Sequence, residues 1–75
     1  MVVGDKFYYE FPNRIDPKKG PTRKYFTIMT LGRKWALIQF DDANVISKKW
    51  QVEISTGLLY HKEYMVGNKT YKDDR

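Results

Sequence analysis

The stretch that decides the fold is KYFTIMTLGRKWALIQF, residues 24–40. Apolar side chains occupy nearly every second position on both sides of Gly32. This alternation is typical of β-strands with one buried face, because successive side chains of a strand point to opposite faces. The stretch therefore predicts an antiparallel hairpin that turns at Gly32.

The register of this hairpin follows from its loop. A two-residue loop at residues 31–32 would require a positive φ at Leu31, which a side chain with a Cβ resists. A three-residue loop, 31–33, avoids this and makes one face uniformly apolar. A slip by one residue would move the whole apolar set to the other face. We therefore expect a core formed by Phe26, Ile28, Ala36, Ile38 and Phe40.

The opposite face of the same hairpin is also rich in apolar side chains. In the chosen register it carries Tyr25, Thr27, Met29, Trp35, Leu37 and Gln39. Such a face is too apolar to be ordinary solvated surface. Either residues 12–23 or residues 64–66 pack on it as a second layer, or it binds a partner. Both interpretations stay open.

The remaining segments complete an all-β chain. Residues 6–11 form a first strand, and residues 12–23 hold all three prolines and form a long loop. Two further strands are expected within residues 45–54 and 58–66. Thr70 and Asp73 have the spacing of a capping box, which allows a short C-terminal helical turn at most. We predict one domain, residues 1–75, built from five short strands.

Composition excludes several classes of protein. The chain has 75 residues, no cysteine and one histidine, which leaves no disulfide or thiolate metal site. Nothing after Met1 resembles a signal peptide, and no apolar run approaches the roughly 20 residues of a membrane span. We therefore expect a cytoplasmic protein without a metal, a cofactor or a membrane partner.

No enzyme signature emerges from the reactive side chains. Asp41 and Asp42 are adjacent in a turn, where neighbouring carboxylates point apart and cannot act as an acid–base pair. His61 and Glu63 share a face of a strand, but no nucleophile is tied to them. We expect a protein that is not an enzyme and that works by binding.

The net charge of +5 is concentrated in one loop. Residues 14–24 hold five basic residues and one acid, a local charge of +4, and the rest of the chain is nearly balanced. Cations on a mobile loop beside aromatic rings are typical of sequence-tolerant nucleic-acid binding. A basic, aromatic surface suits an acidic protein equally well. The cations of this loop are Arg14, Lys18, Lys19, Arg23 and Lys24.

Two sequence patterns resemble known barrels. GDKFYY, residues 4–9, and WALIQFDDANVISKKWQV, residues 35–52, resemble SH3-like and Tudor-like barrels. That resemblance implies a small five-stranded SH3-like barrel with a long basic loop between its first two strands. The OB fold, which is also a five-stranded barrel, is the alternative. The arrangement GDKFYY…YFTIMTLGRKWALI…STG also resembles small β-barrel accessory proteins encoded by bacteriophages, which implies a protein acting in the host cytoplasm.

Two functional hypotheses follow. In the first, a phage accessory protein binds and modulates an acidic host protein through the basic loop and through Tyr25, Met29, Trp35 and Leu37. In the second, a nucleic-acid-binding barrel places the loop cations on phosphates and stacks bases on Tyr25 and Trp35. The resemblance to phage proteins favours the first. We expect a monomer or a weak dimer.

Overall fold

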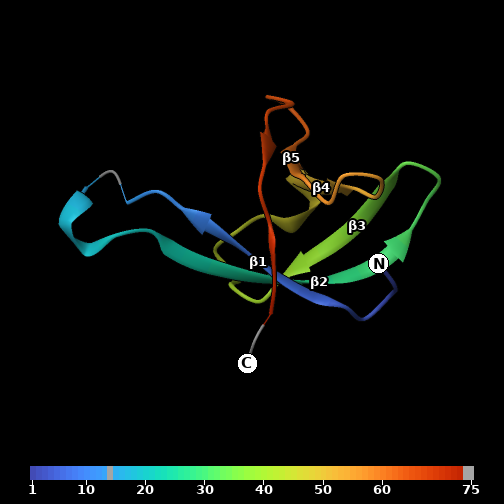
Figure 1. Cartoon of the computed structure of the whole chain (residues 1–75), viewed down its shortest axis with the longest axis horizontal. Helices are drawn as coiled ribbons and strands as arrows, with labels where there is room; N and C mark the ends of the chain where they lie inside the picture. Colours follow the sequence, from blue (N-terminus) through green and yellow to red (C-terminus); the bar gives the residue numbers. More distant parts are fainter. Residues whose placement is uncertain (14, 74–75) are drawn as a thin grey trace.

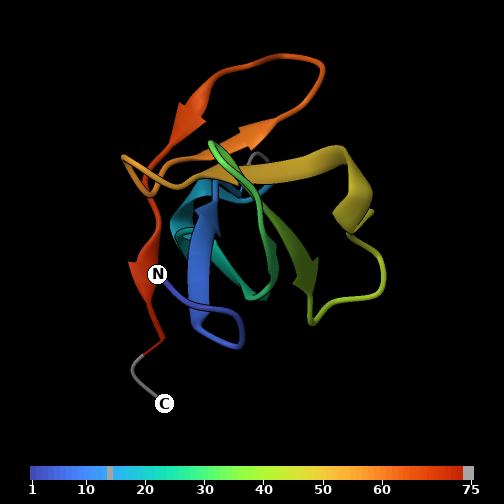
Figure 2. The same ribbon diagram turned by 90° about the vertical axis from the view of Figure 1, so that its right-hand side faces the viewer.

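The computed structural model describes residues 1–13 and 15–73. One antiparallel sheet of seven strands, in the order β6-β5-β4-β3-β2-β1-β7, curls as a half-barrel around the core (Figures 1 and 2). The all-β prediction is confirmed, but the strand count is seven and not five. The strands are β1 Lys6–Phe11, β2 Thr22–Leu31, β3 Trp35–Phe40, β4 Trp50–Glu53, β5 Leu59–His61, β6 Gly67–Asn68 and β7 Tyr71–Lys72.

The core lies where the central hairpin predicted it. Phe26 pairs with Phe40 and Ile28 with Ile38, so these side chains share the inner face of the sheet. Neighbouring strands add Val52 and Leu59, both fully buried. Removal of this apolar surface from water is the main force that closes the sheet. The predicted inward set is confirmed: Phe26, Ile28, Ala36, Ile38 and Phe40 are all buried.

The turn of the hairpin is not where it was predicted. β2 runs to Leu31, which pairs with Ala36, and the Gly32 N–H donates to the Trp35 carbonyl at 3.0 Å. The predicted loop over residues 31–33 is therefore wrong. A bulge between Ile28 and Thr30 inserts one extra residue into β2 and shifts the register. The bulge explains why the inward face was predicted correctly from a misplaced turn.

The fourth and fifth predicted strands are shorter than expected. Residues 47–49 form a 3₁₀ turn, η2 (Ser47–Lys49), so β4 begins only at Trp50. β5 ends at His61, and the chain then turns through Met65, whose φ is +52°. The short strand β6 returns along β5 from this turn.

The described C-terminal residues, 67–73, are extended and not helical. β6 and β7 are separated only by residues 69–70, yet β6 pairs with β5 and β7 pairs with β1, at opposite edges of the sheet (Figure 1). The Thr70 hydroxyl donates to the Gly57 carbonyl at 2.6 Å and does not cap a helix. The predicted helical turn is wrong, because pairing with β1 engages the backbone of Tyr71 and Lys72. One short segment thus connects both edges of the sheet.

No helix long and apolar enough to cross a membrane occurs in residues 1–13 and 15–73.

Candidate functional site

The most prominent feature of the surface is a two-stranded arm. We define the arm as residues 10–23, which are the outer ends of β1 and β2 with the loop between them. The pairing of β2 with β3 starts at Phe26, and β7 reaches only Tyr8 of β1. The arm strands therefore pair with each other alone among the described residues. The arm projects along the longest dimension of the molecule, 39 Å (Figure 1).

In the tip of the arm, residues 13–19, the described residues 13 and 15–19 are ordered by local hydrogen bonds. The Asn13 Oδ1 accepts the N–H groups of Ile15 at 3.2 Å and of Asp16 at 3.0 Å. The Asp16 carboxylate accepts the Lys18 N–H at 3.2 Å and so caps the 3₁₀ turn η1 (Pro17–Lys19). None of the described tip residues is buried. The order of the tip therefore comes from local polar contacts and not from core packing.

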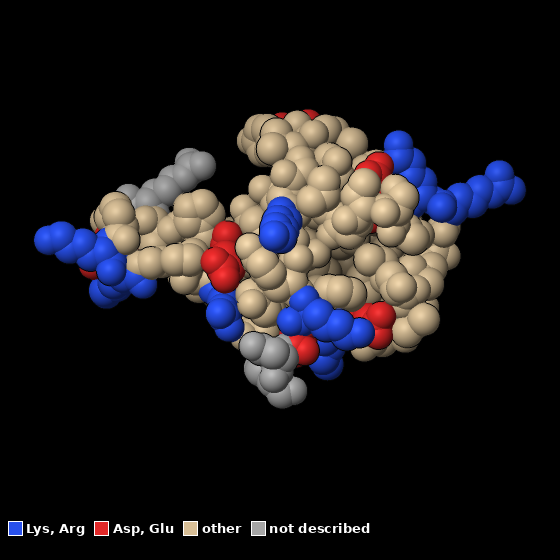
Figure 3. All heavy atoms as spheres, viewed as in Figure 1, with Lys and Arg blue, Asp and Glu red and all other residues tan. Residues whose placement is uncertain are grey.

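The tip presents one apolar and two cationic side chains to solvent. Ile15 is 98% exposed, the highest value among the large apolar residues of the described chain. Lys18 and Lys19 lie beside it, both exposed, and Figure 3 shows Lys and Arg side chains gathered at the far end of the arm. Sequence reasoning missed Ile15 because it belongs to no alternating strand. The Asn13–Asp16–Pro17 pattern, typical of a turn, is the signal that identifies a fixed tip.

A shallow groove of about 430 Å³ runs along the inner side of the arm. Its apolar lining is Phe11, Pro12, Ile15 and Val45, and its polar lining is Asn13, Thr22 and Lys24. The groove lies between the arm and the turn that follows β3. It places apolar surface directly behind the exposed tip.

Two of the five predicted loop cations are engaged within the molecule. The Arg23 guanidinium lies 3.8 Å from the Glu10 carboxylate and 4.6 Å from the centre of the Tyr8 ring. The Lys24 ammonium forms an ion pair with Asp42. This contact lowers the pKa of the Asp42 carboxyl below its ordinary value, and the Asn44 N–H adds to the effect. Arg14 lies outside the described residues, so the loop cations without an ion pair in the described chain are Lys18 and Lys19.

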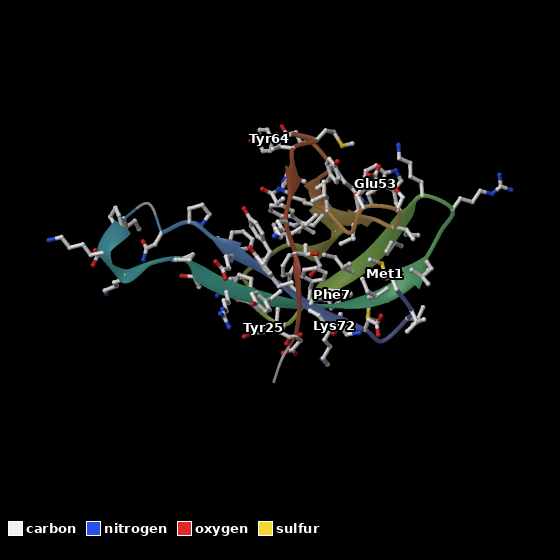
Figure 4. The ribbon with its side chains drawn as sticks, in the orientation of Figure 1. Met1, Phe7, Tyr25, Glu53, Tyr64 and Lys72 are labelled. Carbon is white, nitrogen blue, oxygen red and sulfur yellow. The ribbon has the colours of Figure 1, made fainter. Side chains whose placement is uncertain are left out.

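Tyr25 belongs to a row of three tyrosines on the outer face of the sheet. Its ring lies 5.3 Å from the ring of Tyr8, which stacks at 5.2 Å on Tyr71. A side-chain hydrogen bond between Tyr25 and Arg23 is the main cause that raises the pKa of Arg23. Figure 4 shows Tyr25 beside the crossing of β1 and β2. The row joins β2, β1 and β7, and its Tyr71 could not be placed there from the sequence.

The predicted Trp35 face lies at the other end of the molecule from the arm tip. The Trp35 ring contacts the Tyr60 ring edge-on at 5.3 Å, and the Lys34 ammonium lies 5.4 Å from its centre. Met29 is 53% and Leu37 is 49% exposed. Figure 1 places the hairpin of β2 and β3 opposite the arm. The structure therefore separates the predicted site residues into two surfaces.

Neither residues 64–66 nor the described part of residues 12–23, the two segments proposed as a cover, packs on this face. The arm projects away from it, and Tyr64 is 70% exposed at the outer end of the turn after β5 (Figure 4). Val66 is 62% exposed. The second-layer interpretation is wrong, and Met29 and Leu37 remain open to solvent.

The described residues contain no group of three His, Asp or Glu side chains that could hold a metal ion. His61 is placed by the turn after β5, where its Nδ1 accepts the Glu63 N–H at 3.2 Å. Comparisons of the chain with family models, with curated proteins and with solved structures found no match.

Proposed function

We propose that this chain is a non-enzymatic protein-binding module that engages its partner with the arm tip. The observation that carries the proposal is a tip ordered by its own hydrogen bonds although it buries none of its described residues. A segment fixed before binding loses less conformational entropy in the complex. The three prolines of the arm add to this by restricting the unfolded chain.

The side chains of the tip define the chemistry of the partner. Ile15 fits an apolar pocket, because its full exposure leaves its whole surface to be buried on binding. Lys18 and Lys19 can pair with carboxylates at the rim of that pocket. The attraction between these charges would speed association. The proposed partner is therefore an acidic protein surface with an apolar pocket.

The nucleic-acid alternative has less support. Arg23 and Lys24 already contact carboxylates, so their transfer to phosphates would break ion pairs. Tyr25 and Trp35, the proposed stacking rings, lie in separate ring clusters, Tyr25 with Tyr8 and Trp35 with Tyr60. A single strand would need cations and rings along one continuous path.

The architecture and the origin are part of the same proposal. An SH3-like barrel is supported by the curled antiparallel sheet whose edges are connected through residues 67–72. The proposal that a bacteriophage encodes the protein, and that it modulates a host protein in the host cytoplasm, rests on the sequence resemblance described above.

The test is capture from a nuclease-treated bacterial lysate on four immobilised proteins. These are the wild type, Ile15→Ser, the double variant Lys18→Ser/Lys19→Ser, and the control Val66→Ser, which removes an equally branched exposed side chain from another turn. A partner of the arm is retained by the wild type and by the control and is lost with Ile15→Ser. The double lysine variant should slow association more than it shortens the lifetime of the complex.

Two results would contradict the proposal. One is a partner retained equally by Ile15→Ser and by the wild type. The other is binding of a labelled single-stranded oligonucleotide that weakens linearly with log salt, at about 0.7 per phosphate neutralised, and that needs Lys18 and Lys19. The second result would establish the nucleic-acid alternative.

A further inference from the structure

β3 and β4 diverge, and a cleft lies where they separate. Their pairing ends at Leu37 and Gln51, while β3 continues to Phe40. The Phe40 N–H donates to the Ser47 Oγ at 2.8 Å, which holds η2 beside the end of β3. The cleft has a volume of about 250 Å³ and lies on a different part of the chain from the arm.

Two lysines from different elements line this cleft. Lys48 comes from η2 and Lys62 from the turn after β5, and the Lys62 N–H donates to the Lys49 carbonyl at 2.8 Å. The lining contains no carboxylate, and neither lysine has an ion pair in the described chain. With two lysines and no carboxylate in its lining, the cleft carries a local positive charge that favours a bound anion.

The rest of the lining combines apolar side chains with hydrogen-bonding groups. Leu37, Ile38 and Trp50 supply the apolar surface. The Trp50 ring is fixed from behind by Phe11 at 5.8 Å and by His61 at 4.9 Å. The hydroxyl of Ser47 and the amide of Gln39 add hydrogen-bonding groups. The volume is below that of most sites for drug-sized ligands, which limits the ligand to about one ring and one charged group.

We propose that this cleft binds a phosphate monoester of a small aromatic molecule. The phosphoryl group lies between Lys48 and Lys62, and the ring packs on Leu37 and Trp50. A phosphate monoester is close to doubly charged at neutral pH, which matches two lysines, and lysine binds phosphate as a point charge. The inference goes beyond the proposed function, because no residue that lines the cleft belongs to the arm.

The test is a titration with phenyl phosphate, followed by Trp50 fluorescence in a Trp35→Phe variant that removes the other indole. Phenyl phosphate should bind saturably, and phenol, inorganic phosphate and benzoate should each bind about tenfold more weakly or less. Lys48→Ser/Lys62→Ser should lower the affinity about tenfold or more. The control Lys18→Ser/Lys19→Ser removes the same charge from the arm and should leave it unchanged.

Amide shifts of the wild-type protein give a readout that needs no variant. Phenyl phosphate should shift residues 47–50 and 62 most. Absence of saturable binding, equal binding by Lys48→Ser/Lys62→Ser, or shifts centred elsewhere would each overturn the proposal. Equal binding of inorganic phosphate would overturn the aromatic part, and equal binding of benzoate would overturn the preference for phosphate.

Discussion

The two halves of β2 belong to regions that are ordered by different forces. In the second half, Phe26 and Ile28 are buried, and at Phe26 and Thr27 the strand is paired with β1 on one side and with β3 on the other. Before that point, Thr22 and Arg23 are exposed and pair only with β1 among the described residues. Burial of apolar surface orders the core half. Local polar contacts, together with the backbone restriction that the prolines impose, order the arm half. Stability and binding should therefore respond to different substitutions.

The largest expected effect is in the core half. Ile38→Ala should lower the free energy of unfolding by about 2–5 kcal/mol, because it leaves a cavity among packed side chains. Thr27→Ala should cost far less, since its Oγ1 only accepts an exposed hydrogen bond from Lys6 at 3.2 Å. Denaturant unfolding of both variants measures the difference. A larger loss for Thr27 than for Ile38 would show that the register is wrong.

A smaller effect is expected at the edge that β7 closes. Tyr71→Ala should remove the stacking on Tyr8, which contributes about 0.5–1.5 kcal/mol beyond area burial. The Asp73 amide, which donates to the Lys6 carbonyl, should then exchange faster. Tyr71→Phe keeps the ring and serves as the control. An unchanged exchange rate in Tyr71→Ala would show that the stacking does not hold β7.

The contact between the core and the base of the arm predicts a pH effect. The pKa of Asp42 is lowered in the folded state, chiefly by the hydrogen bond from Lys24. The resulting stabilisation is present above the unfolded pKa of about 3.9 and is lost as the pH falls through the lower folded value. When the pH is lowered through this range, the midpoint of denaturant unfolding should therefore decrease less for Asp42→Asn than for the wild type. If the midpoint decreased equally with pH in the two proteins, the stabilising role given to Asp42 would be contradicted.

The smallest global effect is expected at the arm tip. Asn13→Ala removes the acceptor of two backbone N–H groups, but the tip contributes nothing to the core. The free energy of unfolding should stay within about 0.5 kcal/mol of the wild type. Hydrogen exchange at Ile15 and Asp16 should become faster. If Asn13→Ala lowered the free energy of unfolding as much as Ile38→Ala does, the arm and the core would unfold together.

Much of the core could be predicted from the sequence, because alternation reports burial directly. Phe26, Ile28 and Ile38 follow from the period of two alone. The bulge after Ile28 has no sequence signature, so the turn was misplaced by the same reasoning. At the C-terminus, Thr70 and Asp73 have the spacing of a local cap. Pairing with β1, which is distant in sequence, outweighs that local preference.

The binding surface was less predictable, because side-chain contacts between distant elements decide which charges are free. Lys18 and Lys19 were predicted as exposed cations, and the structure leaves them so. The pairing of Lys24 with Asp42 depends on how the turn after β3 approaches β2, which alternation does not report. Lys48 and Lys62 are brought to one cleft by the pairing of β4 with β5, which the Lys62 N–H continues to the Lys49 carbonyl and which alternation does not report.

The prolines next to the tip of the arm, Pro12 and Pro21, affect how the protein associates with other copies at high concentration. The unpaired N–H and C=O groups of a strand edge can form hydrogen bonds with a strand of another molecule, and repeated pairing of this kind produces aggregates. The Tyr25 carbonyl accepts from Asp41, so the backbone polar groups of position 23 in β2, and of position 21 just before β2, face away from β1. The Lys6 carbonyl accepts from Asp73, so the backbone polar groups of position 10 in β1, and of position 12 just after β1, face away from β2. Pro12 and Pro21 lack the N–H that an incoming strand requires. The arm can therefore extend into solvent without seeding the growth of a shared sheet.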